Sequence, residues 1–375
     1  MMKMTFKSTW LALAAGLVVV GCGGGGADTT PRSKISAVKV FGDSLADVGT
    51  FGGVRATVQG TGIQMYPELV AAAFGTTVCN FYVFTGTTFA ANPKAGCTDY
   101  AIGGGVINHS NPANPLGIPL QLATAGAAGF SATDLLVIDG GGNDAAALVT
   151  AYLGATKDGG AALAALLSTL LPPAQVGAAL AGGATTTAAI GGAYMQALAD
   201  KFYASIKANA LDKGAQQVLV LNMPGITNTP RFQMVLNSIG AAAGATARAQ
   251  SEALFKGWIS AFNTQLDAKF AGDSRVAVAD FYTAFNDQVA MPAQFGLSNA
   301  STPACPIKGL GSDGLPTYDF ATCTATALSA APPTGVSDPN WWKGYAFSDG
   351  FHPTPYGHQL VYQLISKSLA IKGWL

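Results

Sequence analysis

The chain has 375 residues, of which 49% are hydrophobic and 11% are charged, and its formal net charge is +0 at pH 7. Globular proteins average about 25% charged residues. With so few charged residues, the surface has no basic patch that could bind nucleic acid or another polyanion. Nucleic acid is therefore excluded as a partner.

Residues 1–21 have the layout of an export signal. Lys3 and Lys7 precede an apolar core that runs from Trp10 to Val20. This core is too short to cross a membrane, because a span needs roughly 20 apolar residues. It ends at Gly21-Cys22, which resembles a bacterial lipoprotein signal, in which the cysteine is lipidated and becomes the mature N-terminus. The alternative is an ordinary cleaved signal followed by an incidental cysteine.

Residues 22–33 are rich in Gly, Thr and Pro and show no periodicity, so we expect a flexible tether. A lipid on Cys22 would anchor the exported protein in the bacterial cell envelope. Gly23, where some bacterial lipoproteins have Asp, points by the same resemblance to the outer membrane. Without the lipid, the protein would be periplasmic or secreted.

Residues 34–375 are expected to form one α/β domain. Short apolar, β-branched runs alternate with helical patterns, which is typical of a parallel sheet with helices on both faces. We therefore predict a three-layer α/β/α sandwich around a parallel sheet of about five strands. These strands are expected near residues 35–40, 100–102, 134–139, 217–221 and 276–280.

Helices are predicted where apolar residues recur every three to four positions, over 61–74 and 241–270. A last helix is expected to begin at Pro355, with Thr354 as its N-cap.

Two insertions are expected within this domain. The Ala-, Leu- and Gly-rich residues 145–210 predict two or three helices, and residues 286–343 predict a long irregular segment. Within the irregular segment, Trp341 and Trp342 either line an acyl or sugar pocket or pack in the interior.

Four cysteines follow Cys22, and an even number in an exported chain suggests disulfide bonds. Three connectivities are possible in principle, and the sequence-local pairs are Cys79–Cys97 and Cys305–Cys323. In the chain-entropy model each local cross-link contributes about 3 kcal/mol. The chain has no Cys-Xaa-Xaa-Cys motif, so neither a zinc ribbon nor a thioredoxin-like site is supported.

Four short blocks carry the candidate chemistry. The first strand stops at Gly42-Asp43-Ser44, and the carboxyl ends of parallel strands face the ligand site. The other blocks follow in the order Gly103-Gly104-Gly105, Gly142-Asn143-Asp144 and Asp349-Gly350-Phe351-His352. A lone serine after a strand is usually a turn residue or a helix N-cap. Four such blocks in this order indicate an active site more strongly than any one block does alone.

Hydrolysis by a serine needs a base beside the hydroxyl and a group that orients this base. The chain has three histidines. His109 lies in a Pro-rich loop, and His358 falls within the last predicted helix. His352 has Asp349 three residues before it, so a single turn would let the carboxylate hold one ring nitrogen while the other faces Ser44. Taken alone, Asp349 is more simply a loop residue that caps a turn.

The four blocks resemble those of the GDSL esterases, also called SGNH hydrolases, over nearly the whole chain beyond the leader. This resemblance implies a flavodoxin-like α/β/α fold. It also implies that Ser44 is the nucleophile, that His352 is the base and that Asp349 is the partner of His352. No cofactor or metal is expected.

The same resemblance implies an oxyanion hole made by the backbone N–H groups of Ser44 and Gly104 and by the side-chain amide of Asn143. The segment 99–104, Asp-Tyr-Ala-Ile-Gly-Gly, resembles the family's Asn-Xaa-Ala-Xaa-Xaa-Gly, with Asp99 in place of Asn. The choice among the three adjacent glycines is open by one residue. Asn143 could otherwise cap the helix that follows it.

The leading interpretation is a serine carboxylesterase or lipase that acts on a small-molecule or lipid ester, with no protein partner. One alternative is an acetylesterase that acts on decorated polysaccharide or cell-surface glycan. Another is a non-catalytic surface lipoprotein that keeps the fold. Other chemistries lack their motifs, since the chain has no Gly-Xaa-Ser-Xaa-Gly elbow, no P-loop and no His-Glu-Xaa-Xaa-His.

Overall fold

The computed structural model describes residues 34–375, which all belong to one compact unit built on a parallel sheet. Its four strands lie in the spatial order β1-β4-β5-β6. They are β1 (Ala37–Phe41), β4 (Asp134–Ile138), β5 (Gln217–Leu221) and β6 (Val276–Ala279). In this register Val40 lies opposite Val137, which lies opposite Leu219, and Leu219 lies opposite Ala277.

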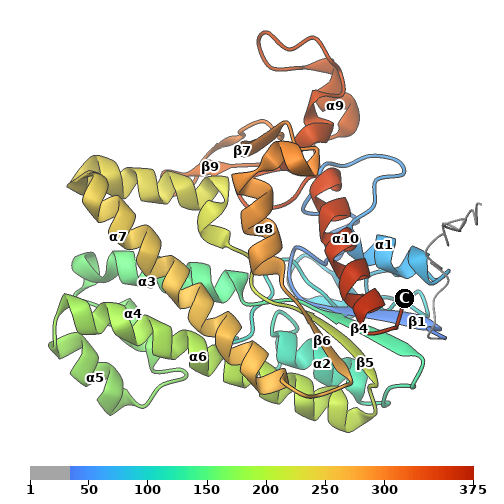
Figure 1. Ribbon diagram of the computed structural model, residues 1–375, viewed down its shortest axis with the longest axis horizontal. Coiled ribbons are helices and arrows are strands. Elements are labelled where there is room, and N and C mark those ends of the chain that lie inside the picture. Colours follow the sequence, from blue (N-terminus) through green and yellow to red (C-terminus); the bar gives the residue numbers. More distant parts are fainter. Residues whose placement is uncertain (1–33) are drawn as a thin grey trace, which may run out of the picture. The chain divides into compact units, whose positions relative to one another are not determined.

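Helices cover both faces of the sheet (Figure 1). One face carries α1 (Tyr66–Ala73), α8 (Phe281–Ala290) and α10 (Pro355–Ile371). The other carries α2 (Ile118–Gly126), α3 (Gly142–Asp158), α6 (Ala184–Asn209) and α7 (Pro230–Phe270).

Alternate residues of β4 point into the two cores. Leu135 and Val137 pack with the helices of the first face, and Leu136 and Ile138 with those of the second. Every residue of β4 is buried, as expected for a parallel strand covered on both sides. The predicted three-layer α/β/α class is therefore confirmed.

The strand expected at 100–102 is not formed, so the sheet has four strands in place of about five. The segment runs beside the edge of β1, where the Tyr100 N–H donates to the Val40 carbonyl (2.8 Å), but it forms only isolated bridges, which join Asp99 to Val40 and to Asn80. The Asp99 carboxylate accepts from the N–H groups of Ala101 (3.0 Å) and Val48 (2.9 Å). Such side-chain bonds to the backbone compete with strand pairing.

The helix boundaries differ from the predictions in two places. The helix predicted over 61–74 begins only at Tyr66, where Glu68 accepts a hydrogen bond from the Met65 N–H (2.8 Å) and so closes the first turn. The helix predicted from residue 241 begins earlier, at Pro230, and is interrupted at Gly244, whose φ of 88° is left-handed. This interruption appears as the bend of α7 in Figure 1. The last helix begins at Pro355, as predicted, and the Thr354 hydroxyl caps it.

The two insertions have contrasting structures. The helical one, residues 145–210, holds most of α3, then α4 (Ala161–Leu167), α5 (Pro173–Ala181) and α6, which is four helices where two or three were expected. In the irregular one, β7 (Asn299–Pro303) pairs with β10 (Tyr345–Phe347), which lies just beyond the insertion. It also holds the short hairpin β8 (Gly309–Leu310) and β9 (Pro316–Thr317), and α9 (Ala325–Ala330).

Both disulfides join the sequence-local pairs of cysteines. Cys79–Cys97 closes a loop that contains the hairpin of β2 (Tyr82–Phe84) and β3 (Phe89–Ala91). Cys305–Cys323 closes the loop that contains β8 and β9. Trp342 is buried beside this second disulfide in a small separate core, with Trp341 packed against it. The structure therefore favours interior packing for the two tryptophans.

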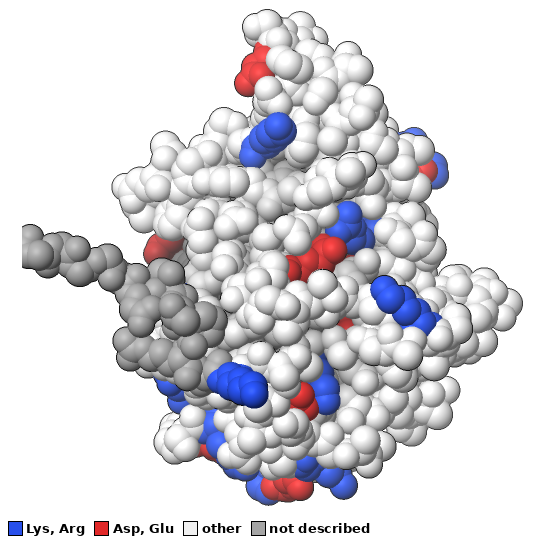
Figure 2. Space-filling model, turned by 90° about the vertical axis from the view of Figure 1, so that its right-hand side faces the viewer, with Lys and Arg blue, Asp and Glu red and all other residues white. Residues whose placement is uncertain are grey.

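The proposed signal (residues 1–21), Cys22 and the tether (residues 22–33) lie outside the described residues. Among residues 34–375, no helix combines the length and the apolar character needed to cross a bilayer. On the face drawn in Figure 2, charged side chains of both signs are few and scattered among uncharged ones. The two disulfides are consistent with an exported protein.

Candidate active site

Segments that follow all four strands line one cavity of about 400 Å³. β1 leads into Ser44, β4 into Asn143, β5 into Asn222 and β6 into Phe281. In open α/β sheets, ligands bind at this edge, where the carboxyl ends of the strands meet. The rest of the wall is mainly apolar and includes Ala146, Pro224, Ile226, Phe285, Phe320 and Phe351.

The turn after β1 is fixed at Gly42. Its φ is 156°, and a Cβ atom there would lie 1.8 Å from the Asp139 Oδ1 atom, so only glycine fits. The buried Gln121 side chain holds the same peptide, because its Oε1 accepts from the Gly42 N–H (2.9 Å) and its Nε2 donates to the Gly42 carbonyl (3.0 Å). The Asp43 N–H donates to Asp139 Oδ1 (3.0 Å). These hydrogen bonds restrict the backbone just before Ser44 and so fix Ser44 at the wall of the cavity.

The structure brings Ser44, His352 and Asp349 together in series. His352 Nε2 lies 2.7 Å from Ser44 Oγ, and His352 Nδ1 lies 2.9 Å from both carboxylate oxygens of Asp349. Asp349 Oδ1 also accepts from the N–H groups of Phe351 (2.8 Å) and His352 (2.7 Å). The carboxylate is thus oriented by the turn that carries the imidazole.

Asp349 and His352 shift each other's pKa values in opposite directions. Burial by itself would lower the pKa of His352, but the charge and hydrogen bond of Asp349, with a further contribution from Asp43, raise this pKa above its ordinary value. Burial would likewise raise the pKa of Asp349, yet His352 and the two backbone N–H groups lower it overall.

The other two histidines lie elsewhere. His109 is partly exposed, and its Nδ1 atom lies 2.9 Å from the Asn111 carbonyl oxygen. His358 is fully buried in α10, and burial lowers its pKa to about 3, so its ring is neutral.

The residues predicted for the oxyanion hole, Ser44, Gly104 and Asn143, all line the cavity. Within residues 34–375, the N–H groups of Ser44 and Gly104 have no hydrogen-bond acceptor. The Asn143 Nδ2 atom donates to the Gly105 carbonyl (2.9 Å) and reaches Asp43 Oδ2 (3.5 Å). Gly104 has a φ of 83°, which suits glycine. Asn143 lies inside the first turn of α3, whose N-cap is Gly141.

Two buried aspartates support the glycine loop. Asp47 Oδ2 accepts from the Gly103 N–H (2.8 Å), while Asp47 Oδ1 accepts from Gly49 and Thr50. Asp99 occupies the place where the family pattern has Asn, and it accepts hydrogen bonds from the N–H groups of Val48 and Ala101. Because both Asp99 bonds are accepted from N–H groups, a carboxylate serves as well as an amide oxygen.

Sequence reasoning missed several residues that shape the site. Gln121, which holds Gly42, and Phe320, which lines the cavity, carry no local pattern that could have revealed them. Asp139 could have been found, because it directly follows the most fully buried strand of the sheet, at the edge where the ligand site was expected. Its second oxygen accepts from the buried Tyr66 hydroxyl (2.6 Å).

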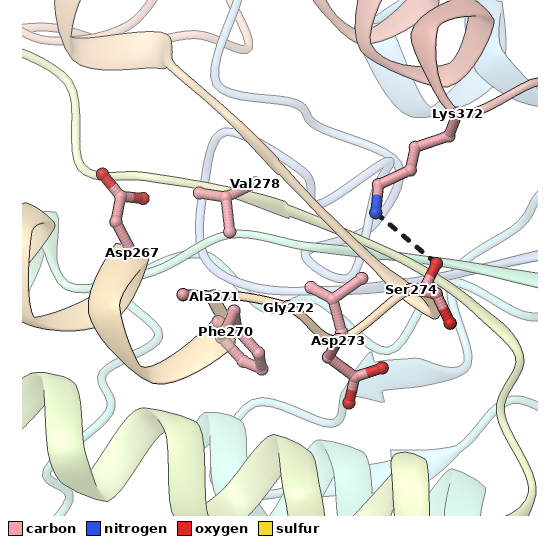
Figure 3. A pocket seen from close by; sticks show the side chains of 9 residues that line it. Asp267, Phe270, Ala271, Gly272, Asp273, Ser274, Val278 and Lys372 are labelled. Atoms are coloured by element: carbon pink, nitrogen blue, oxygen red, sulfur yellow. Dashed lines mark hydrogen bonds between the residues drawn. The ribbon is translucent and has the colours of Figure 1, made fainter.

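A hollow of about 370 Å³ lies at the opposite edge, before β6, and its chemistry is different (Figure 3). Its side chains include Asp267 and Lys372, and Lys372 Nζ donates to the Ser274 carbonyl (3.4 Å). No hydroxyl and imidazole pair lines it. Throughout the described part of the chain, no group of three or more His, Cys, Asp or Glu side chains is placed to hold a metal ion.

The site has a hydroxyl, an imidazole and a carboxylate in series, and they lie at the carboxyl edge of a parallel sheet beside free N–H groups. This arrangement is typical of serine hydrolases. Residues 38–365 match the model of the GDSL-like lipase/acylhydrolase family, so the chain belongs to this family and is an acyl hydrolase. The predicted family is thus confirmed. Comparison with curated proteins returned no match.

Proposed function

We propose that the protein is a serine esterase or lipase that hydrolyses carboxylic acyl esters. The observation that carries this proposal is the continuous line of hydrogen bonds from Ser44 Oγ through the His352 ring to Asp349, at the wall of a largely apolar cavity. The same line weighs against a surface lipoprotein that has kept only the fold.

In the proposed reaction, Ser44 Oγ attacks the ester carbonyl carbon while His352 Nε2 takes the hydroxyl proton. Asp349 stabilises the imidazolium that forms. His352 then gives this proton to the alcohol oxygen as the carbon–oxygen bond to the alcohol breaks, which leaves the acyl group on Ser44. A water molecule attacks the acyl-enzyme, gives its proton to His352 and releases the carboxylic acid as Ser44 regains its proton.

The negative charge on the carbonyl oxygen is stabilised by N–H donors. The free N–H groups of Ser44 and Gly104 and the amide of Asn143 are the proposed donors. Removing one such donor typically costs about 3–4 kcal/mol of transition-state stabilisation, so Asn143→Ala should lower kcat by two to three orders of magnitude.

The proposal is tested with a fluorophosphonate probe and a panel of esters of graded acyl chain length. The probe should label Ser44, and Ser44→Ala should abolish both labelling and hydrolysis. Labelling at another serine, with full activity of Ser44→Ala, would overturn the assignment. An acetylated glycan is run beside the panel, because the sequence blocks do not separate an esterase from a glycan acetylesterase.

We further propose that residues 1–21 direct export and that Cys22 carries a lipid anchor. The apolar core of the leader, the Gly-rich tether and the two disulfides support an exported, envelope-attached enzyme. Fractionation of cells that express the wild type or Cys22→Ala tests the anchor. The wild type should be recovered with the membranes and Cys22→Ala in the soluble fraction. Recovery of both as soluble protein would refute the anchor and leave the catalytic proposal unchanged.

A further inference from the structure

A second cavity, of about 230 Å³, meets the first one at Ser44. Ser44, Ala56, Gly103 and Phe320 line both cavities. The Phe320 ring also meets the His352 imidazole edge-on, with 5.5 Å between the ring centroids. The nucleophile therefore lies where two separate spaces join, as expected if the two halves of an ester extend in different directions from the reacting carbon.

The second cavity continues onto an exposed aromatic cluster made of Phe51, Phe84 and Phe89. Phe51 lines the cavity, and its ring lies 5.4 Å from that of Phe84 and 6.0 Å from that of Phe89. Phe51 and Phe84 are 38% and 40% exposed. Large apolar side chains that are exposed together more often mark a binding site than single ones do.

This aromatic cluster is held in place and touches the glycine loop. A Cβ atom on Gly103 would lie 3.2 Å from the Phe51 ring. Phe84 and Phe89 face each other across the β2–β3 hairpin, which the Cys79–Cys97 disulfide encloses. The Phe84 N–H donates to the Thr50 carbonyl (2.9 Å), which ties the hairpin to the segment after Ser44. The cluster is therefore a preformed surface beside the proposed oxyanion donors.

The charged side chains that line the second cavity are already engaged. The Asp47 carboxylate accepts three backbone N–H groups, from Gly49, Thr50 and Gly103. Arg55 Nη1 is paired with Glu68 (2.8 Å) and also donates to the Ile63 carbonyl. With both charges satisfied, the cavity offers a ligand apolar contact rather than an ionic partner. A sugar, whose hydroxyl groups need hydrogen-bond partners, fits it less well than an apolar group does.

We propose that the second cavity and the Phe51–Phe84–Phe89 cluster bind the alcohol part of the ester, and that this part is uncharged and apolar or aromatic. The inference rests on the proposed esterase function. The alcohol leaves the enzyme first. The second cavity suits it, because this cavity continues onto exposed side chains. The acyl group stays on Ser44 for longer and occupies the larger cavity, whose apolar wall contains the buried Phe281 and Ile226.

The test compares acetate esters of ethanol, benzyl alcohol and naphthol, beside ethyl esters of graded acyl length. We expect Phe51→Ala and Phe84→Ala to lower the ratio of kcat/KM for benzyl over ethyl acetate about fivefold, because each removes one aromatic contact. The preference for acyl length should stay as in the wild type. Ile371→Ala is the control, since Ile371 is 77% exposed at the end of α10 and lines neither cavity.

A second measurement does not depend on catalysis. Binding of naphthol to the Ser44→Ala protein is followed by its fluorescence, and adding Phe51→Ala should weaken this binding about fivefold. If the wild type hydrolyses no ester and naphthol still binds through Phe51, the esterase proposal fails, and the second cavity stands only as a site for an aromatic ligand. If the substitutions leave the benzyl-to-ethyl ratio of kcat/KM unchanged, or shift the preference for acyl length instead, the second cavity does not bind the alcohol part. The esterase proposal would stay intact.

Discussion

His352 lies between a hydroxyl and a carboxylate, and its two ring nitrogens therefore have separate tasks. Nδ1 keeps its proton for Asp349, at 2.9 Å, so that Nε2 is free to accept the proton of Ser44, at 2.7 Å. The imidazole can accept this proton only when it is neutral. Asp349 holds the pKa of His352 above its ordinary value. At mildly acidic pH, a larger fraction of the enzyme therefore carries a protonated, inactive imidazole than if the pKa of His352 were unperturbed.

This balance predicts the pH profile at the residue scale. For the wild type, kcat/KM should rise with pH through a midpoint above ~6.5, the ordinary pKa of histidine. Asp349→Asn removes the charge that raises this pKa, so the midpoint should move to lower pH. The maximal rate should fall about ten-thousandfold, because the amide no longer stabilises the imidazolium.

The control is Asp338→Asn, which replaces an exposed carboxylate outside the cavity and should leave rate and midpoint unchanged. Initial rates measured from acidic to mildly alkaline pH test the prediction. A midpoint that stays in place in Asp349→Asn would show that Asp349 does not set the protonation of the base.

At the scale of elements, α6 and α7 pack closely because Gly191 has no side chain. A Cβ atom at Gly191 would lie 2.3 Å from the indole of Trp258 in α7, and the Trp258 Nε1 atom donates to the Ala188 carbonyl (3.0 Å). At the next residue, Gly192, a Cβ atom would make only an ordinary contact, 4.0 Å from Trp258 Cδ1. Two adjacent glycines in one helix thus differ in packing alone.

Substitution of these two glycines should have effects of opposite sign on stability. Gly191→Ala overpacks the contact and should lower the free energy of unfolding by about 1–3 kcal/mol. Gly192→Ala should raise it by roughly 0.5–1 kcal/mol, since alanine favours the helix over glycine. Urea unfolding measures both. Equal effects of the two substitutions would mean that Trp258 does not pack against Gly191 in solution.

At the scale of the whole molecule, five buried aspartates gather near the carboxyl edge of the sheet: Asp43, Asp47, Asp99, Asp139 and Asp144. Burial raises the pKa of each of them. The pKa of Asp144 is raised to about 6, although its carboxylate accepts from the N–H groups of Ile107 and Asn108. The site is thus built on acids that are costly to ionise in the folded state.

The raised pKa values predict a stability that falls as pH rises. An unfolded aspartate titrates near ~3.9, so between about pH 4 and 6 the folded Asp144 binds more protons than the unfolded one. Below this pH range, protonated Asp144 contributes about 3 kcal/mol to the free energy of unfolding. This contribution is lost as the pH rises through the range. Asp144→Asn should therefore gain stability relative to the wild type as pH rises from 4 to 7.

Urea unfolding at several pH values measures this difference. Asp212→Asn removes an exposed carboxylate and serves as the control for surface charge, with an expected effect within about 1 kcal/mol. A difference between the wild type and Asp144→Asn that is the same at every pH would contradict the prediction.

The sequence alone was sufficient for features that neighbouring residues decide. Val38 and Val40 predict a buried strand that stops at the block Gly42-Asp43-Ser44, and a spacing of three residues allows Asp349 and His352 to share one turn. Both depend on local backbone geometry, and so do the N-cap at Thr354 and the alternation of strands and helices. The family and the α/β/α class were predictable for this reason.

The tertiary structure decided what depends on contacts between distant segments. Ser44 and His352 are 308 residues apart in the chain, and their distance of 2.7 Å arises because the fold brings the turn after β1 against the segment before α10. The hydrogen bonds of Asp99 to Val48 and Ala101 accompany the loss of the expected fifth strand. The wall formed by Phe320 and the aromatic cluster around Phe51 combine two loop residues with the β2–β3 hairpin, and these segments are far apart in the sequence. Cavities arise where unrelated segments meet, and no local rule of sequence encodes that meeting.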